Sequence, residues 1–129
     1  MFERLDFIYL PSRDVEAERD HLTAALGAEL VFAIEAFGTR VAMLRVTPEP
    51  PALLLAGHLE GDRPVLVHRV ADLEREVAEL ERRDVGIGSR FEIPPGPALE
   101  LEIPGPQRFA LYERTRPDVL ERLAGRRDF

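Results

Sequence analysis

The chain contains an internal repeat. Residues 14–18 read Asp-Val-Glu-Ala-Glu, and residues 72–76, 58 positions later, read Asp-Leu-Glu-Arg-Glu. At the same offset the apolar run 7–9 lies over the apolar run 65–67. A repeat of this length indicates one folding unit used twice, with the two copies packed so that they close a shared space. The repeat therefore predicts an architecture and the place where a ligand would bind.

Each copy reads as a strand, a helix and three further strands. Short apolar or alternating runs bounded by Gly and Pro predict the strands, and apolar residues one turn apart predict the helices. The first copy is expected to hold strands at 5–10, 28–34, 39–46 and 52–57 and a helix at 13–26, and the second copy strands at 64–70, 87–93, 98–103 and 107–113 and a helix at 72–83.

Helix-capping residues stand at the expected ends of both helices. Asp14 or Ser12 can cap the first helix and Asp72 the second, because a side-chain oxygen there accepts from a free backbone N–H. Gly27 and Gly86 are expected to end the two helices, since glycine adopts the left-handed conformation without a steric cost.

We interpret residues 1–129 as a single domain, because neither copy alone has enough elements to cover its sheet. Module one is expected at about 4–58 and module two at about 64–114. A short C-terminal helix is expected at about 117–124, and residues 126–129 are expected to fray.

Composition excludes several classes of function. The net charge of −7 argues against nucleic-acid binding, which needs cations facing phosphates. Without Cys or Lys there is no thiol nucleophile, no thiolate metal site and no Schiff-base chemistry. No apolar run is long enough to cross a membrane, and acids near the start argue against a signal peptide. The sequence therefore predicts a cytoplasmic protein.

The chain resembles the vicinal oxygen chelate superfamily, which includes glyoxalases, bleomycin-resistance proteins and extradiol dioxygenases. The resemblance rests on the order and spacing of several short motifs. These are the opening Leu-Asp-Phe-Ile-Tyr-Leu-Pro at 5–11, Leu-Gly-Ala-Glu-Leu at 26–30, Val-Ala-Asp-Leu at 70–73, and the closing Pro-Gly-Pro-Gln-Arg-Phe-Ala-Leu-Tyr-Glu at 104–113. The fold implied is α+β, with two paired βαβββ modules forming curved mixed sheets around a cleft and helices outside.

Enzymes of this superfamily hold a divalent metal in the cleft. The resemblance places the four ligand positions at Phe7, Leu54, Val65 and Ala110. None of these side chains has an N, O or S donor, which metal binding requires. We therefore expect no metal and no cofactor.

The alternation of side chains between the two faces of a strand predicts which residues line the cleft. If Phe7 and Ala110 face inwards, alternate residues of the same strands share that side. The candidate ligand-binding residues are thus Phe7, Tyr9, Leu54, Val65, Val67, Arg69, Arg108, Ala110 and Tyr112.

Two arginines and two tyrosines among apolar residues suit an aromatic or anionic ligand. The guanidinium group of Arg can form two parallel hydrogen bonds with a carboxylate, and the tyrosine rings can stack on an aromatic ligand. In the alternative, Arg69 and Arg108 are solvated strand ends paired with Glu100, Glu102 or Glu113. Glu100 and Glu102 alternate along one strand and are expected to face solvent.

The three histidines, His21, His58 and His68, fall on a helix, a strand end and the helix-facing side of a strand. They do not converge in this topology, so a histidine metal site is not expected.

We therefore predict metal-independent binding of a small organic molecule, as in bleomycin-resistance proteins. Two alternatives stay open: a metal-dependent enzyme of the glyoxalase or dioxygenase type, and a structural or regulatory module with a filled cleft. The resemblance also implies a homodimer. No nucleic-acid or membrane partner is expected.

Overall fold

The computed structural model describes residues 1–36 and 38–129. In these residues it holds eight strands and three helices, and it confirms the expected α+β fold of paired βαβββ modules. The elements are β1 (Arg4–Pro11), α1 (Val15–Leu26), β2 (Glu29–Ala36), β3 (Thr39–Arg45), β4 (Ala52–Ala56), β5 (Val65–Val70), α2 (Leu73–Arg82), β6 (Gly86–Ile93), β7 (Gly96–Glu102), β8 (Arg108–Glu113) and α3 (Val119–Leu123).

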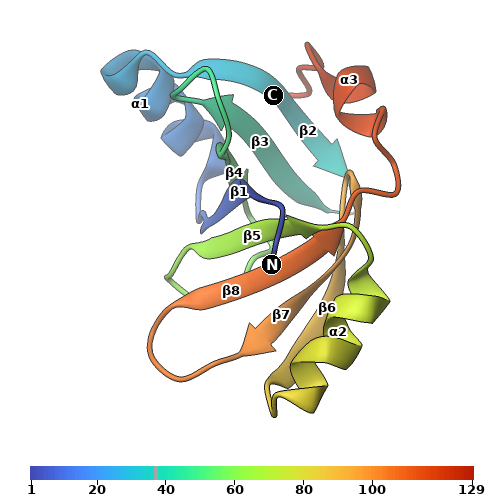
Figure 1. Ribbon diagram of the computed structural model, residues 1–129. Helices are drawn as coiled ribbons and strands as arrows, with labels where there is room; N and C mark the ends of the chain where they lie inside the picture. Colours follow the sequence, from blue (N-terminus) through green and yellow to red (C-terminus); the bar gives the residue numbers. More distant parts are fainter. Residues whose placement is uncertain (37) are drawn as a thin grey trace.

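All eight strands belong to one curved sheet in the order β2-β3-β4-β1-β5-β8-β7-β6 (Figure 1). β1 and β5, the first strands of the two copies, pair antiparallel at the centre, where Ile8 lies opposite Leu66. β4 runs parallel to β1, and β8 runs parallel to β5. An approximate two-fold axis through the Ile8–Leu66 pair therefore relates the two copies.

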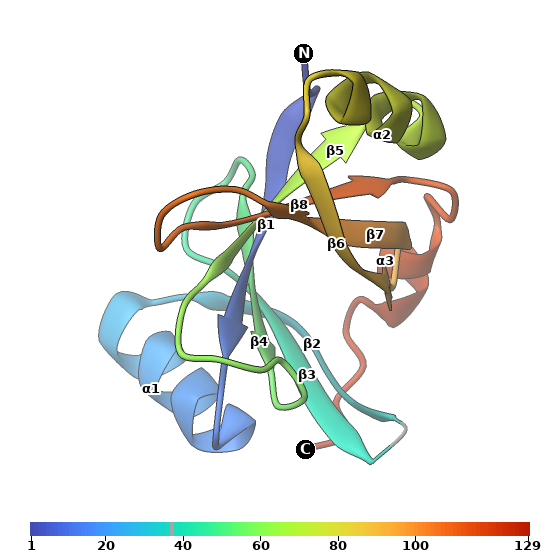
Figure 2. The same ribbon diagram turned by 90° about the horizontal axis from the view of Figure 1, so that it is seen from below.

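The two long helices pack on the outer face of the sheet. α1 covers β2, β3 and β4 through a cluster that includes Val15 and Leu22, and α2 covers the other end through Leu73, Val77 and Leu80. Figures 1 and 2 show α1 and α2 at opposite ends of the molecule. Neither α1 nor α2, the two long helices of the described chain, consequently covers the outer face of the central strands β1 and β5.

Both helices begin at the predicted caps. Asp14 accepts a hydrogen bond from the backbone N–H of Ala17 at 3.0 Å, and Asp72 accepts one from Arg75 at 3.1 Å. Each such cap stabilises its helix by about 1 kcal/mol. Gly27 ends α1 in the left-handed conformation, with φ of 67°.

The prediction that Gly86 ends the second helix is wrong. α2 ends at Arg82, and Asp84 takes the positive φ of 59°, a conformation that Asp tolerates better than most residues. Gly86 is instead the first residue of β6. A Cβ on Gly86 would lie 2.7 Å from the Glu102 carboxylate and 3.1 Å from the Glu102 Cβ, so a larger residue there would make the Glu102 side chain shift.

The prediction that residues 126–129 fray is also wrong. This C-terminal tail runs beside the edge strand β2, where the backbone N–H of Ala33 donates to Arg126 at 2.9 Å and that of Asp128 donates to Ala33 at 2.7 Å. The tail thus supplies partners for backbone groups that an edge strand would otherwise expose.

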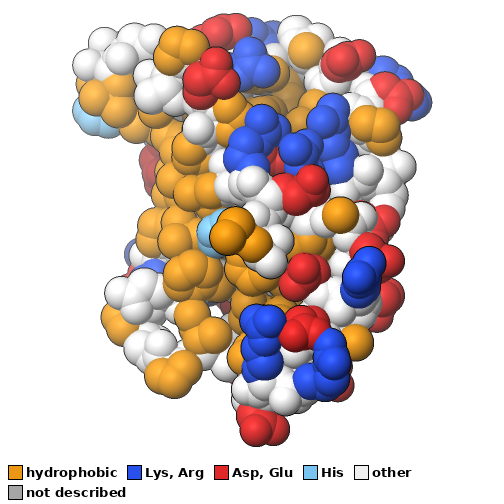
Figure 3. Space-filling view, in the orientation of Figure 1, with side chains coloured by type: hydrophobic (Ala, Val, Ile, Leu, Met, Phe, Trp, Pro, Cys, Tyr) orange, Lys and Arg blue, Asp and Glu red, His pale blue; other side chains and the backbone are white. Residues whose placement is uncertain are grey.

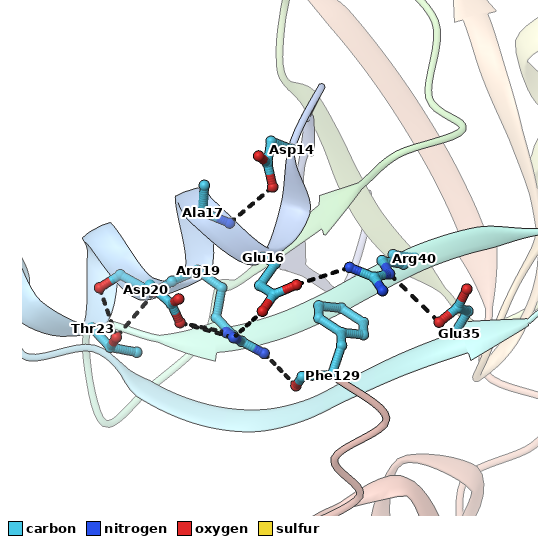
Figure 4. A network of polar contacts seen from close by, with 9 residues as sticks. All are labelled: Asp14, Glu16, Ala17, Arg19, Asp20, Thr23, Glu35, Arg40 and Phe129. Carbon is cyan, nitrogen blue, oxygen red and sulfur yellow. Dashed lines mark hydrogen bonds and ion pairs between the residues drawn. The ribbon is translucent and has the colours of Figure 1, made fainter.

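Phe129 anchors the end of this tail (Figure 4). Its ring lies against two guanidinium groups, with ring centroids 5.1 Å from Arg19 and 4.6 Å from Arg40. Arg19 also donates to the Phe129 carbonyl, and Arg40 pairs with Glu16 at 3.0 Å. The tail therefore joins β2 to α1 and β3.

The largest apolar cluster fills the concave face of the sheet, opposite α1 and α2. It includes residues from both copies, and Leu120 and Leu123 of α3 pack against it. α3 is shorter than predicted and covers part of this face.

Among the described helices, none is both long and apolar enough to span a bilayer.

Candidate functional site

The four positions implied as metal ligands lie together on the concave face. Phe7, Leu54, Val65 and Ala110 are 4%, 1%, 1% and 0% exposed. The register pairs Tyr9 with Leu54 and Val67 with Ala110, so Leu54 and Ala110 take equivalent places in the two copies. These residues form a closely packed centre rather than an open cleft.

The residues at this centre do not fit a metal ion. Their side chains are hydrocarbon and offer no lone pair for coordination. In residues 1–36 and 38–129, no three His, Asp or Glu side chains come together in a group that could hold a metal. We therefore derive no chemistry through a metal.

The histidines lie apart. His21 is exposed on α1, and His58 lies 3.4 Å from the Thr39 hydroxyl. On the outer face, the His68 ring stacks on Phe109 with ring centroids 5.5 Å apart and an interplanar angle of 5°.

A cavity of about 550 Å³, here named the Tyr9 cavity, opens at one end of the packed centre. Tyr9, Leu59, Val65, Phe91 and Ile93 form its apolar wall. Its polar lining consists of His58, Glu60, Ser89, Glu92, Glu100 and Arg108.

Tyr9 is the buried donor of this cavity. Its side chain is 5% exposed, and its hydroxyl makes no hydrogen bond with another described residue. Burial raises the pKa of the Tyr9 hydroxyl well above its usual range. A tyrosine hydroxyl is protonated at neutral pH, and the raised pKa keeps this one protonated into the alkaline range, so it can donate a hydrogen bond to a ligand.

Arg108 and Glu100 form an ion pair at the edge of the Tyr9 cavity. The guanidinium donates to the Glu100 carboxylate at 2.7 Å and to the Glu60 carbonyl at 2.7 Å. Glu100 is the register partner of Ala110, so its side chain lies on the concave face of the sheet. This differs from the expectation that Glu100 faces open solvent. The pairing of Arg108 agrees with the ion-pair alternative from the sequence.

A second cavity of about 180 Å³, here named the Asp6 cavity, opens at the other end of the packed centre. Asp6 reaches the concave side although it adjoins Phe7, because the β1–β5 register shifts between Leu5 and Phe7. Asp6 is 5% exposed and accepts hydrogen bonds from the Tyr112 hydroxyl and the Arg4 guanidinium.

Arg69 lies beside this carboxylate. Its Nε is 3.8 Å from Asp6 and 3.6 Å from Glu3, and within the described chain this buried Nε makes no hydrogen bond. Burial and the hydrogen bond to Asp6 raise the pKa of Tyr112 well above its usual range. The Tyr112 hydroxyl consequently remains a donor to Asp6.

The two cavities take equivalent places in the two copies. Phe7 and Ala52 line the Asp6 cavity, and Val65 and Arg108 line the Tyr9 cavity. Phe7 and Ala52 are register partners on the parallel strands β1 and β4. Val65 and Arg108 are register partners on the parallel strands β5 and β8, the corresponding strands of the second copy.

The nine candidate residues therefore do not line one cleft. Tyr9, Val65 and Arg108 line the larger cavity, and Phe7 and Tyr112 line the smaller one. Leu54, Val67 and Ala110 lie in the packed centre, and Arg69 lies next to Asp6.

Sequence reasoning missed Asp6 and Phe91. The bulge that turns Asp6 inwards has no sequence signature. Phe91 lies on β6, whose irregular pairing with β7 obscures strict alternation, and no signal in the sequence identified it.

Neither a protein-family model nor a curated protein sequence matches the chain. Several solved structures do. A hypothetical protein from Bacillus halodurans superimposes with a TM-score of 0.72 at 14% identity, over 87% of this chain and 94% of that one. A methylmalonyl-CoA epimerase from Mycobacterium tuberculosis gives 0.71 at 19% identity, over 88% and 89%. A Streptomyces coelicolor methylmalonyl-CoA epimerase in complex with 2-nitronate-propionyl-CoA gives 0.69 at 17% identity, over 89% and 99%.

The superpositions show that this chain has the same fold as these epimerases, in agreement with the eight-stranded curved sheet described above. Identities this low show the fold alone. The function of this chain therefore depends on the residues that its own site contains.

Proposed function

We propose that the protein binds a small aromatic molecule in the Tyr9 cavity without using a metal. The observation that carries this proposal is a cavity of about 550 Å³ that is lined by a buried tyrosine, Tyr9, whose hydroxyl makes no side-chain hydrogen bond among the described residues. Small-molecule sites are typically concave and apolar, with a few polar groups that orient the ligand.

The walls of the cavity suit a flat ring. Phe91 and Tyr9 offer aromatic surface, and Val65 and Ile93 offer branched aliphatic surface. Burying such surface against a ligand is favourable at roughly 25 cal/mol per Å². The Tyr9 hydroxyl would fix the ring by donating a hydrogen bond to an acceptor at its edge.

The charges of the cavity favour the aromatic alternative over the anionic one. The sequence suggested that the guanidinium of Arg108 binds an anionic ligand, but this group is already paired with the Glu100 carboxylate. Glu92 is paired with Arg116 at 3.3 Å, and Glu60 has no cationic partner among the described residues. An anion here would face excess carboxylate, so the ligand is expected to be neutral or cationic.

The metal-dependent alternative has less support, because the four implied ligand positions carry hydrocarbon side chains. The alternative of a structural module with a filled cleft describes the packed centre but leaves the open Tyr9 cavity without a role.

Three ligands that share one ring test the proposal. Tryptamine is cationic, indole is neutral and indole-3-acetate is anionic. Because the protein contains no Trp, the fluorescence anisotropy of the indole ring reports on the ligand alone. We expect binding in the order tryptamine, indole, indole-3-acetate, with unchanged affinity after treatment with EDTA.

Two substitutions provide a matched comparison. Ser89→Phe places a ring in the cavity and should abolish binding, whereas Arg75→Phe on the exposed face of α2 should leave it unchanged. The proposal fails if none of the three ligands binds, or if Ser89→Phe binds them as well as wild type.

A further inference from the structure

The Asp6 cavity differs in charge from the rest of the molecule. Its charged lining consists of three guanidinium groups, Arg4, Arg45 and Arg114, and two carboxylates, Asp6 and Glu49. The chain as a whole carries a net charge of −7. A cationic lining in an acidic protein is therefore a local feature, which average composition does not explain.

Two of the three guanidinium groups are free to meet a ligand. Among the described residues, Arg45 has no ion-pair partner, and the guanidinium of Arg114 makes only one hydrogen bond, at 3.4 Å, to the Pro117 carbonyl. Surface arginines in this protein are usually paired, as Arg90 is with Glu74.

The carboxylate of Asp6 does not oppose an anion in the cavity. It already accepts from the Arg4 guanidinium and the Tyr112 hydroxyl, and Arg69 lies 3.8 Å away. Its negative charge is thus compensated by protein groups. Asp6 instead holds Arg4 and Tyr112 in place at the cavity.

The remaining walls are apolar. Phe7 packs against Tyr112 with ring centroids 5.5 Å apart, and α3 contributes Leu120 to the cavity. The other apolar lining residues are Met43, Pro48, Pro50 and Ala52. A ligand that fills this space would bury apolar atoms against these walls while its charged group faces the arginines.

We propose that the Asp6 cavity is a second binding site, separate from the Tyr9 cavity, for a small carboxylate with a short apolar tail. A guanidinium fork matches the two oxygens of a carboxylate, and charge-assisted hydrogen bonds of this kind are strong. Inorganic phosphate would satisfy the arginines but would leave the apolar walls unused. The volume of about 180 Å³ limits the tail to a few carbons.

Isobutyrate is the probe, and its binding is followed residue by residue in amide NMR spectra of the ¹⁵N-labelled protein. We expect shift changes around Asp6, Met43 and Tyr112, and none around Phe91 in the Tyr9 cavity. Shift changes confined to the Tyr9 cavity, or none at saturating isobutyrate, would overturn the proposal.

Single substitutions of exposed residues keep the fold and test the charges. Arg45→Gln and Arg114→Gln should each weaken isobutyrate about tenfold, the lower end of what a charge-assisted hydrogen bond contributes. Glu49→Gln removes a repelling charge and should strengthen binding. Arg75→Gln makes the same charge change far away on α2 and should have no effect.

A parallel titration with inorganic phosphate at the same ionic strength tests the apolar part of the site. Weaker binding of phosphate than of isobutyrate supports the proposal. Equal binding, or equal loss of isobutyrate in Arg75→Gln and Arg45→Gln, would mean that charge alone attracts the anion and would contradict it.

Discussion

The hydroxyl of Tyr112 on β8 donates a hydrogen bond to the buried carboxylate of Asp6 on β1, 106 residues earlier in the chain. The bond joins the last strand of module two to the first strand of module one. It also holds Asp6 against Arg4, at the edge of the Asp6 cavity.

We expect Tyr112→Phe to lower the free energy of unfolding by about 2 kcal/mol, because a hydrogen bond to a buried charged group is lost. Tyr9→Phe is the control, since Tyr9 is also buried on the same face but its hydroxyl makes no side-chain hydrogen bond among the described residues. Urea unfolding of both variants measures the difference. Equal losses in the two variants would contradict the account.

Stability is expected to fall at alkaline pH. The pKa values of Tyr9 and Tyr112 are raised by burial, and that of Tyr112 also by its hydrogen bond to Asp6, whereas an unfolded tyrosine titrates near pH 10. Above about pH 10 the unfolded chain loses protons that the folded chain keeps, so the unfolded state is favoured.

Urea unfolding at pH 8 and pH 11 measures this alkaline loss of stability. A double variant, Tyr9→Phe with Tyr112→Phe, should show a smaller loss between the two pH values than wild type. The same loss in both proteins would mean that other groups cause it.

The C-terminal tail should contribute to stability. Phe129→Ala removes the ring that packs against Arg19 and Arg40, and each cation–π contact contributes about 0.5–1 kcal/mol. We expect a loss of about 1–2 kcal/mol in thermal or urea unfolding when the lost packing is included. Leu26→Ala, at an exposed apolar residue of α1, should change stability little by comparison.

The outer face of β1 and β5 carries an apolar row without a covering helix. Leu53, Ile8, Leu66 and Phe109 follow one another across four neighbouring strands, and Figure 3 shows an exposed hydrophobic band between α1 and α2. The row is centred on the approximate two-fold axis. Such a face is typical of an interaction surface.

We propose that the homodimer implied by the family resemblance forms through this face. Leu66→Glu should then yield a monomer in sedimentation velocity, whereas Leu26→Glu, away from the face, should remain dimeric. A monomeric wild type at high protein concentration, or a dimeric Leu66→Glu variant, would rule this interface out.

The repeat predicted the architecture because strand and helix periodicity, the caps Asp14 and Asp72, and Gly27 all act locally. Tertiary contacts decided the rest. The tail could not be predicted from its own residues, since Arg126 and Phe129 are ordered by β2 and α1.

The candidate site was predictable only in part. Strand parity placed Tyr9, Phe7 and Tyr112 on the concave face, because alternation holds along a regular strand. It did not show that large side chains close the centre and leave two cavities. Nor could it anticipate the bulge that turns Asp6 inwards or the pairing that occupies Arg108.

The central claim is that the duplicated fold binds a small molecule without a metal. Native mass spectrometry of tryptamine-equilibrated protein, before and after treatment with EDTA, tests it most directly. We predict one tryptamine per chain, no stoichiometric divalent metal, and the same tryptamine occupancy after chelation. A stoichiometric metal whose removal abolishes tryptamine binding, or no bound tryptamine at all, would contradict the account.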